Sequence, residues 1–232
     1  MNIQYLGHAC FLITSNKITP KTTSGAASDH YSLLIDPFLN GNPAAKARAE
    51  DVTATHIFVT HGHDDHLGDA VSIATRCAST VYATVETGGR FPQTVKVEVG
   101  QIGGFIRSDF GGVKFTAAAH GSNVPGGLAC GFLIELEGKK IYHAGDTGLI
   151  IDMMLLAEEN VDVALLPIGD RFTMGPRDAM RAVGFIKPKR VVPMHYNTWP
   201  IIEQNPELFK KEAEAVTGVP VSVLAVGEEL QC

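Results

Sequence analysis

The sequence predicts an α/β protein with two mixed β-sheets covered by helices. Short β-branched or aromatic runs alternate with helical patterns along the chain, which is typical of α/β proteins. Two regions, up to Ile35 and from Lys96 to Tyr142, are rich in strands and glycine turns and indicate antiparallel meanders. Because both patterns occur within 232 residues, we expect two mixed sheets in a single domain over residues 1–232.

Individual elements follow from the spacing of apolar residues and from turn and cap residues. The expected strands are Cys10–Thr14, Tyr31–Ile35, His56–Val59, Val81–Thr84, Val113–Ala117, Phe132–Leu136, Val161–Leu166 and Val191–Met194. The expected helices are Pro43–Glu50, capped by Asn42, then Asp69–Arg76, Leu149–Glu158, Arg177–Phe185 and Pro206–Val216. The polar segment from Asn16 to His30 predicts a hairpin loop or flap.

The charge balance argues against nucleic acid as a partner. The formal net charge is -6, and no run of lysine and arginine forms a local exception. Lys187, Lys189 and Arg190 do cluster, but they flank Pro188 ahead of an apolar run, which favours a solvated turn. We therefore expect a small-molecule substrate.

Cysteine usage and the N-terminal sequence predict a cytoplasmic protein. Cys10, Cys77, Cys130 and Cys232 lie far apart without a C-x-x-C pair, so neither a disulfide framework nor a cysteine-only zinc site is expected. Met1 to Tyr5 is strand-like rather than a basic leader, and no apolar stretch is long enough for membrane insertion.

Histidines and aspartates gather in one short segment after the strand His56–Val59. The residues from His61 to His66 read His-Gly-His-Asp-Asp-His, which places three histidines and two aspartates within six residues. Imidazole nitrogens and carboxylate oxygens suit zinc and similar divalent ions. Packing these groups together without a metal costs on the order of several kcal/mol, so the cluster predicts a metal site.

The pattern His61-x-His63-x-Asp65-His66 resembles the H-x-H-x-D-H signature of the metallo-β-lactamase superfamily. The later ligand positions of that superfamily are matched in order by His120 in Ala-His-Gly-Ser, Asp146 in Gly-Asp-Thr-Gly and His195 in Met-His-Tyr-Asn. The resemblance implies a four-layer αββα sandwich. It also implies that His61, His63 and His120 hold one metal, that Asp65, His66 and His195 hold a second, and that Asp146 bridges them.

Further motifs are similar to a branch of metal-dependent hydrolases of uncertain substrate. They are Tyr-Leu-Gly-His-Ala-Cys-Phe around His8, Leu-Ile-Asp-Pro-Phe around Asp36, and His-Tyr-Asn-Thr around Asn197. The branch is similar to ascorbate-6-phosphate lactonases and, more distantly, to N-acylphosphatidylethanolamine phospholipases. The resemblance implies that His8 contacts substrate or leaving group, although a residue in a strand turn is equally compatible with the sequence.

Three other polar residues have both a structural and a functional interpretation. Asp36, before a proline, is expected to position the metal loops by hydrogen bonds. Asn197 and Asn123 are candidate amide donors to substrate, and for Asn123 the turn before Pro125 favours a structural role.

The expected chemistry is hydrolysis. Two divalent ions that share a water lower its pKa toward roughly 7, which predicts a bridging hydroxide as nucleophile. Asp65 would orient its proton, and His8, His195 or the second metal would assist the leaving group. The bond cleaved is an ester, lactone, phosphodiester or amide. Zinc is the expected ion, while manganese, iron and nickel suit the same ligands.

Two alternatives come from other functional classes. The scaffold also hosts di-iron redox proteins, but those usually replace one histidine of the first motif and work with a flavin domain. A non-catalytic member used for binding or assembly is expected to have lost ligands, whereas all seven positions are present here. The sequence leaves open whether the chain forms a homo-oligomer.

Overall fold

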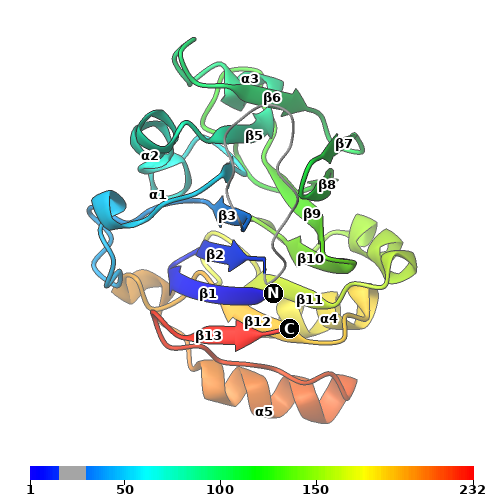
Figure 1. The fold of residues 1–232 in the computed structure, drawn as a ribbon. Coiled ribbons are helices and arrows are strands. Elements are labelled where there is room, and N and C mark those ends of the chain that lie inside the picture. Colours follow the sequence, from blue (N-terminus) through cyan, green and yellow to red (C-terminus); the bar gives the residue numbers. More distant parts are fainter. Residues whose placement is uncertain (16–29) are drawn as a thin grey trace.

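The fold is a sandwich of two mixed sheets, seen in the computed structural model of residues 1–15 and 30–232 (Figure 1). The first sheet has the strand order β13-β1-β2-β3-β4-β5-β6. Its strands are β1 Asn2–Gly7, β2 Cys10–Thr14, β3 Ser32–Ile35, β4 His56–Phe58, β5 Thr80–Thr84, β6 Val97–Gly100 and β13 Glu229–Gln231. Pairing is antiparallel from β13 to β3 and parallel from β3 to β6.

The second sheet has the order β12-β11-β10-β9-β8-β7. Its strands are β7 Phe105–Ser108, β8 Gly111–Ala117, β9 Cys130–Leu136, β10 Lys139–His143, β11 Val163–Pro167 and β12 Val191–Met194. Strands β7 to β10 form an antiparallel meander, and β10 to β12 are parallel. The expected α/β class and the two mixed sheets are confirmed.

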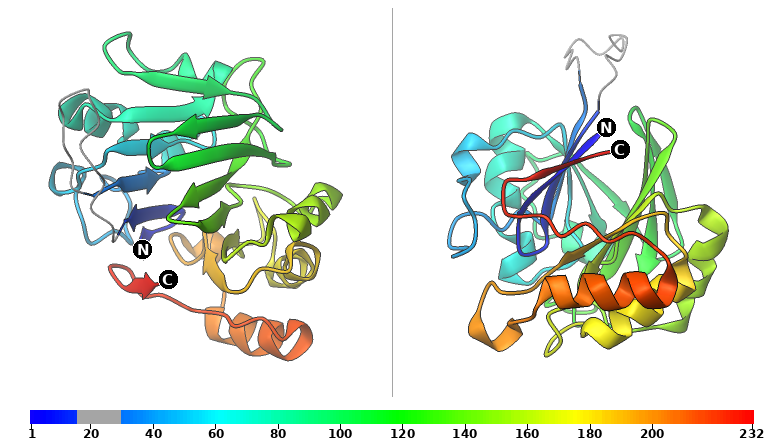
Figure 2. Two further views of the ribbon diagram at one scale, coloured as in Figure 1. Left: turned by 45° about the vertical axis from the view of Figure 1, so that its right-hand side comes forward. Right: turned by 90° about the horizontal axis from the view of Figure 1, so that it is seen from below.

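Helices complete the outer layers on both sides, as the right-hand view of Figure 2 shows. They are α1 Asp64–Leu67, α2 Ala70–Cys77, α3 Val85–Gly88, α4 Pro176–Ile186, α5 Pro206–Thr217 and the 3-10 helices η1 Ala49–Asp51, η2 Ile151–Glu159 and η3 Pro200–Ile202. The expected helices near α2, α4 and α5 are confirmed. The helical pattern after Leu149 forms the 3-10 helix η2. The predicted loop or flap from Asn16 falls outside the described residues, apart from His30.

One expected helix, Pro43–Glu50, is wrong. The segment consists of turns that end in the three-residue η1. Asn42 Oδ1 accepts from the Ala44 backbone N–H at 2.9 Å, and Asn40 Oδ1 accepts from the Ala49 N–H at 3.2 Å. Such side-chain bonds satisfy the backbone locally and compete with helical hydrogen bonding. Asn42 therefore organises a turn rather than a helix cap.

Aromatic side chains fill the space between the two sheets. The ring of Phe58 on β4 lies 5.5 Å from that of Phe132 on β9, and Phe132 lies 5.2 Å from Phe115 on β8. A second apolar cluster lies on the outer face of the first sheet, where Ile57 and other strand residues pack against Ile73 of α2. These two cores hold both sheets rigid, which fixes the loops at their edges.

The loops that carry the expected metal ligands leave the carboxyl ends of strands. In the first sheet β1, β3 and β4 run in one direction, and they precede His8, Asp36 and His61. In the second sheet β8, β10 and β12 also share a direction, and they precede the loops of His120, Asp146 and His195. Strands that share a direction end at one edge of their sheet, so these residues are brought together.

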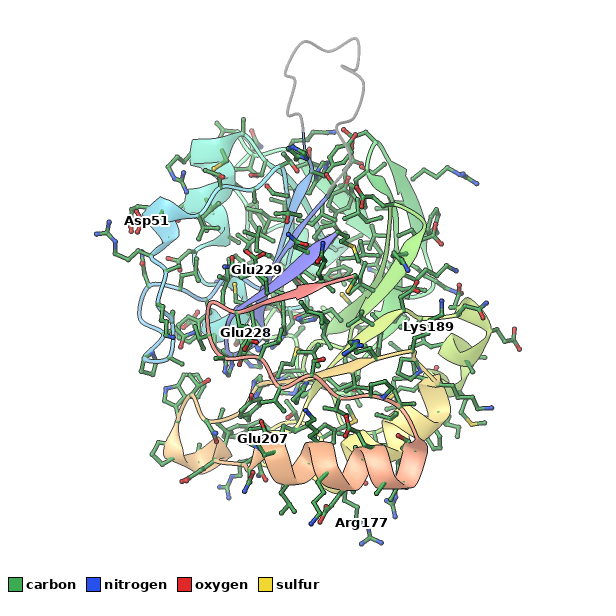
Figure 3. All side chains as sticks on the ribbon, turned by 60° about the horizontal axis from the view of Figure 1, so that its bottom comes forward. Asp51, Arg177, Lys189, Glu207, Glu228 and Glu229 are labelled. Carbon is green, nitrogen blue, oxygen red and sulfur yellow. The ribbon has the colours of Figure 1, made fainter. Side chains whose placement is uncertain are left out.

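Several expectations about partners and location can be compared with the described residues. All four cysteines are free. Lys189 lies at a surface turn, where its side chain is 67% exposed and bonds to Asp162 at 2.8 Å. Figure 3 shows Lys189 at the periphery of the molecule. Over residues 1–15 and 30–232 we find no helix with the length and apolar content needed to cross a bilayer.

A buried histidine far from the ligand loops predicts an acid-sensitive stability. His56 on β4 is 6% exposed, and burial lowers its pKa to about 4, although Asp109 at 3.2 Å partly opposes this. Between pH 6.5 and 4 the unfolded chain therefore binds the extra proton, and stability falls as the pH falls through this window. The loss reaches at most about 3 kcal/mol.

His56→Gln is expected to remove this contribution. Urea unfolding of the metal-free protein at pH 7 and pH 4.5 measures it, because all other titrating groups are common to both proteins. The wild type should lose about 2 kcal/mol more than the variant between the two pH values. Equal losses would contradict the prediction.

Candidate metal centre

Three histidines form the first donor group of the site. His61 and His63 follow β4 and His120 follows β8, and their potential ligand nitrogens lie within 4.8 Å of one another. The rings of His61 and His63 are 4.7 Å apart, and that of His120 lies 5.0 Å from His61 and 5.2 Å from His63. His61 is buried, whereas the other two are half-buried. The group therefore opens toward solvent on one side.

Four residues form the second donor group: His8, Asp65, His66 and His195. Their potential ligand atoms also lie within 4.8 Å of one another. Asp65 and His66 lie on α1, His195 follows β12, and His8 lies in the tight turn between β1 and β2. His8 Nε2 is 3.1 Å from Asp65 Oδ2. The structure thus brings together all seven expected metal ligands and adds His8 to one of the two groups.

Asp146 lies between the two donor groups. Its Oδ1 is 3.2 Å from His66 Nε2, and its Oδ2 is 3.1 Å from His195 Nε2 and 3.6 Å from His120 Nε2. It also shares a possible donor set with His61 and His66. The two oxygens of this carboxylate together face histidines of both donor groups, and a negative group in such a place suits a pair of cations.

Buried polar atoms that make no hydrogen bond test whether these residues fit a metal. Among the described residues, Nε2 of His61, His66 and His195 and Oδ1 of Asp146 are buried and make no hydrogen bond. Leaving such groups unpaired costs free energy, and their convergence on one place is unusual in a folded protein. Nitrogen and oxygen donors of this kind suit divalent zinc, manganese, iron or nickel, so the donor set fits a cation.

The protonation states of the cluster agree with this fit. Burial lowers the pKa of His61 to about 2, which leaves its imidazole neutral and able to bind a cation. Burial alone would raise the pKa of Asp146, but the charges of His66 and His195 outweigh it and hold that pKa well below the usual range. The opposite holds for His66. Burial lowers its pKa, but the charges of Asp146 and Asp36 outweigh burial and raise the pKa well above its usual value. A metal would replace the proton of His66.

Asp36 is hydrogen-bonded to one of the expected ligands directly and to a second through Thr60. It is fully buried, and its Oδ1 accepts from the Thr60 backbone N–H at 2.8 Å. Its Oδ2 accepts from the Thr60 hydroxyl at 2.7 Å and from His66 Nδ1 at 2.7 Å. Since that hydroxyl donates to Asp36, it accepts from His61 Nδ1 at 2.9 Å. Both rings thus hold their proton on Nδ1 and direct Nε2 to the cluster.

Four residues at or beside the site have a strained backbone conformation. His8, Asp36, His195 and Asn197 have φ angles of 58°, 44°, 55° and 57°, in the left-handed region that residues other than glycine rarely adopt. His195 donates its backbone N–H to the carbonyl of His8 at 2.8 Å, which ties the two strained turns together. Such conformations persist only where the surrounding structure holds them, and they are common at functional sites.

The other polar candidates bond within the loops. Asn197 is exposed, and its Oδ1 accepts from the Gln204 backbone N–H at 2.8 Å. Asn123 donates from Nδ2 to the Gly62 carbonyl at 3.2 Å, which fits its structural interpretation. His143 is buried and its Nε2 donates to the Ala9 carbonyl at 2.9 Å. A substrate contact by Asn197 remains a prediction.

Sequence reasoning missed two residues around His8. Thr198 Oγ1 lies 2.8 Å from His8 Nδ1, and the ring of Trp199 lies 5.0 Å from that of His8. Both follow directly after His-Tyr-Asn, the motif of the last expected metal ligand. Their position next to that motif was the one sequence feature that could have pointed to them. Nothing in the sequence indicated that they contact His8 in the first turn of the chain.

A family model for the beta-lactamase superfamily domain matches residues 31–196, which include all seven expected metal ligands. The chain belongs to the metallo-β-lactamase superfamily. Two curated relatives are each named UPF0173 metal-dependent hydrolase. The one from Natranaerobius thermophilus is 42% identical and the match covers 100% of this chain and 99% of the relative, while the one from Pelotomaculum thermopropionicum is 46% identical with 100% of both covered.

A solved structure supports the same family and fold. Igni18, a metallo hydrolase from the archaeon Ignicoccus hospitalis, is 32% identical, with a TM-score of 0.86 and coverage of 99% of this chain and 97% of that one. This superfamily member is therefore a metal-dependent hydrolase, and the αββα sandwich expected from the resemblance is confirmed.

Proposed function

We propose that this hydrolase uses a dinuclear metal centre to cleave an ester, lactone, phosphodiester or amide bond of a small molecule. The observation that carries the proposal is the placement of Asp146, whose two oxygens face histidines of both donor groups. His61, His63 and His120 would hold one ion and Asp65, His66 and His195 the other. When bound, the two ions, zinc by preference, act as Lewis acids and lower the pKa of water toward neutrality.

The protein groups around this centre have distinct proposed roles. Burial raises the pKa of Asp65, but the hydrogen bond from His8 and the charge of His66 outweigh it, so the pKa is lowered and the carboxylate stays ionised. An ionised Asp65 accepts a hydrogen bond from the attacking water and so orients it. The rings of His8 and His195 lie 4.0 Å apart beside it. We propose these two as the groups that assist the leaving group.

Metal content and hydrolysis test the proposal together. The protein is purified without chelator, its metals are counted by elemental analysis, and lactone, phosphodiester, ester and amide substrates are assayed before and after chelation and reconstitution. We expect about two metals per chain and an activity that chelation removes and metal restores. Failure of the protein to bind metal on reconstitution would contradict the proposal. Oxygen consumption with an electron donor, and no hydrolysis, would instead favour the di-iron alternative, which the hydrolase relatives do not support.

His8 contacts Asp65 directly, which suggests a positioning role. Its side chain is fully buried, and its two nitrogens are 2.8 Å from Thr198 Oγ1 and 3.1 Å from Asp65 Oδ2. If the Thr198 hydroxyl donates to Nδ1, the ring proton lies on Nε2 and faces the carboxylate. Thr198 would thus set the tautomer that holds Asp65 in place.

Replacement of Thr198 measures this role. Thr198→Val removes the hydroxyl at nearly constant shape, and we expect the weaker-bound metal to lose about 10- to 100-fold in affinity. Thr198→Ser keeps the hydroxyl and should bind metal like the wild type. Titration against a competing chelator gives both affinities without an activity assay. If valine and serine behave alike, His8 does not act through Asp65, and contact with substrate becomes its better role.

A further inference from the structure

Two half-buried aromatic residues, Phe38 and Trp199, lie beside the second donor group. The Trp199 ring is 5.0 Å from His8 and 6.0 Å from Phe38, and the Phe38 ring is 5.9 Å from His8. Both rings meet His8 edge-on, whereas they are tilted by only 34° relative to each other. Together they form a continuous apolar surface, here called the aromatic wall, one side chain away from Asp65.

Both rings are held in place by the loops that carry them. The Phe38 carbonyl accepts from Asn42 Nδ2 at 3.0 Å, and Asp69 Oδ2 accepts from the next two backbone N–H groups at 3.0 and 2.9 Å. Thr198 is anchored on His8, and the Trp199 carbonyl accepts from the Ile202 N–H at 3.1 Å. A wall that is already ordered loses little conformational entropy when a ligand binds.

Polar side chains in these two loops are engaged within the protein. Asn197 Oδ1 and Asn42 Oδ1 accept from backbone N–H groups of their own loops, and the Thr198 hydroxyl bonds to His8. Phe38 and Trp199, in contrast, are aromatic and only half-buried. Their partial exposure leaves apolar area that a ligand can cover, with a gain proportional to that area.

We propose that the aromatic wall binds a flat apolar part of the substrate, such as a phenyl ring or an unsaturated acyl chain, next to the bond that is cleaved. This inference rests on the proposed function, because the wall lies against His8, whose Nε2 is 3.1 Å from Asp65, one of the residues that would hold the second metal. Offset or edge-to-face contacts with two rings favour an aromatic group over a small aliphatic one. The substrate class narrows to aromatic or apolar esters, lactones and amides, and polar sugar phosphates are disfavoured.

Paired phosphonates test the wall on the intact metal-loaded protein. Methylphosphonate and phenylphosphonate share a metal-binding head group and differ in the ring alone, and glucose 6-phosphate serves as a polar, sugar-bearing probe. The sequence contains one tryptophan, so intrinsic fluorescence reports on Trp199. We expect phenylphosphonate to bind about tenfold tighter than methylphosphonate and to change the emission of Trp199.

Variants assign the preference to the wall. Calorimetric titration of Trp199→Leu and Phe38→Leu should show a reduced preference for the phenyl ligand, with methylphosphonate binding and metal content unchanged. Trp199→Phe should keep part of the preference, because an aromatic face remains. Phe105 on β7 is 44% exposed and serves as the matched control, since Phe105→Leu should change nothing.

The outcomes separate this inference from the function on which it rests. Equal affinity for the two phosphonates, or tighter binding of glucose 6-phosphate that depends on Trp199, overturns the wall while leaving the hydrolase proposal intact. If phenylphosphonate binds and methylphosphonate does not, the result supports the wall and argues that the phosphonate group does not bind to the metals. If neither phosphonate binds to protein that carries two metals, the wall is overturned, while chelation and reconstitution of the hydrolytic activity still decide the hydrolase proposal.

Discussion

Asp146→Asn is expected to reduce hydrolysis about 1,000-fold or more and to lower the metal content below two per chain. The amide has nearly the same shape, but it replaces an anion with a neutral group. The Nε2 atoms of His66 and His195 lie 3.2 and 3.1 Å from its two oxygens, so the amide nitrogen would face one of them. Two cations close together then lack the negative ligand that holds them.

Elemental analysis and kcat/KM with the best substrate of the panel measure this effect. Asp64→Asn is the matched control, because Asp64 lies in the same motif but is exposed and belongs to none of the donor groups. It should keep near wild-type activity and two metals. If Asp146→Asn retained both metals and most of its activity, the bridging role would be wrong and the centre would need a different arrangement.

Asp36→Asn is the second substitution with a large expected effect, although Asp36 is fully buried and belongs to neither donor group. Its Oδ2 accepts from two donors, the Thr60 hydroxyl and His66 Nδ1. An amide nitrogen at this position would oppose both, in a place with no access to water. We expect about 3 kcal/mol lower stability of the metal-free protein and metal affinity reduced about 10- to 100-fold.

Urea unfolding with chelator present measures the stability term, and chelator competition measures the metal term. Thr60→Val provides a graded comparison, because it removes one hydroxyl from the same network and leaves the Asp36 carboxylate in place. We expect it to reduce metal affinity less than Asp36→Asn does. The loss should concern chiefly the metal bound by His61, because the Thr60 hydroxyl is bonded to His61 Nδ1 at 2.9 Å. If Asp36→Asn bound metal as tightly as the wild type, the hydrogen bonds of Asp36 and Thr60 would not be what orients His61 and His66.

Local sequence signals identified most of the elements and failed where side chains redirected the backbone. The strands around Phe58 and Phe132 were readable because β-branched and aromatic runs bury both faces. The segment from Pro43 to Glu50 has helical spacing, yet Asn40 and Asn42 bond to its backbone and hold turns instead. This competition depends on where the preceding loop places the two asparagines, which spacing alone does not encode.

The sequence by itself was enough to propose the metal ligands, because their chemistry lies in residue type and in their position at strand ends. His61, His63, Asp65 and His66 are neighbours in the chain, so their convergence needed no knowledge of the fold. Only the tertiary structure decided which other residues join them. His8 meets Asp65 across 57 residues and Thr198 across 190, and Trp199 covers the same ring. Those contacts exist because strands from two sheets end at one edge, and strand register is fixed by the packing of the whole core.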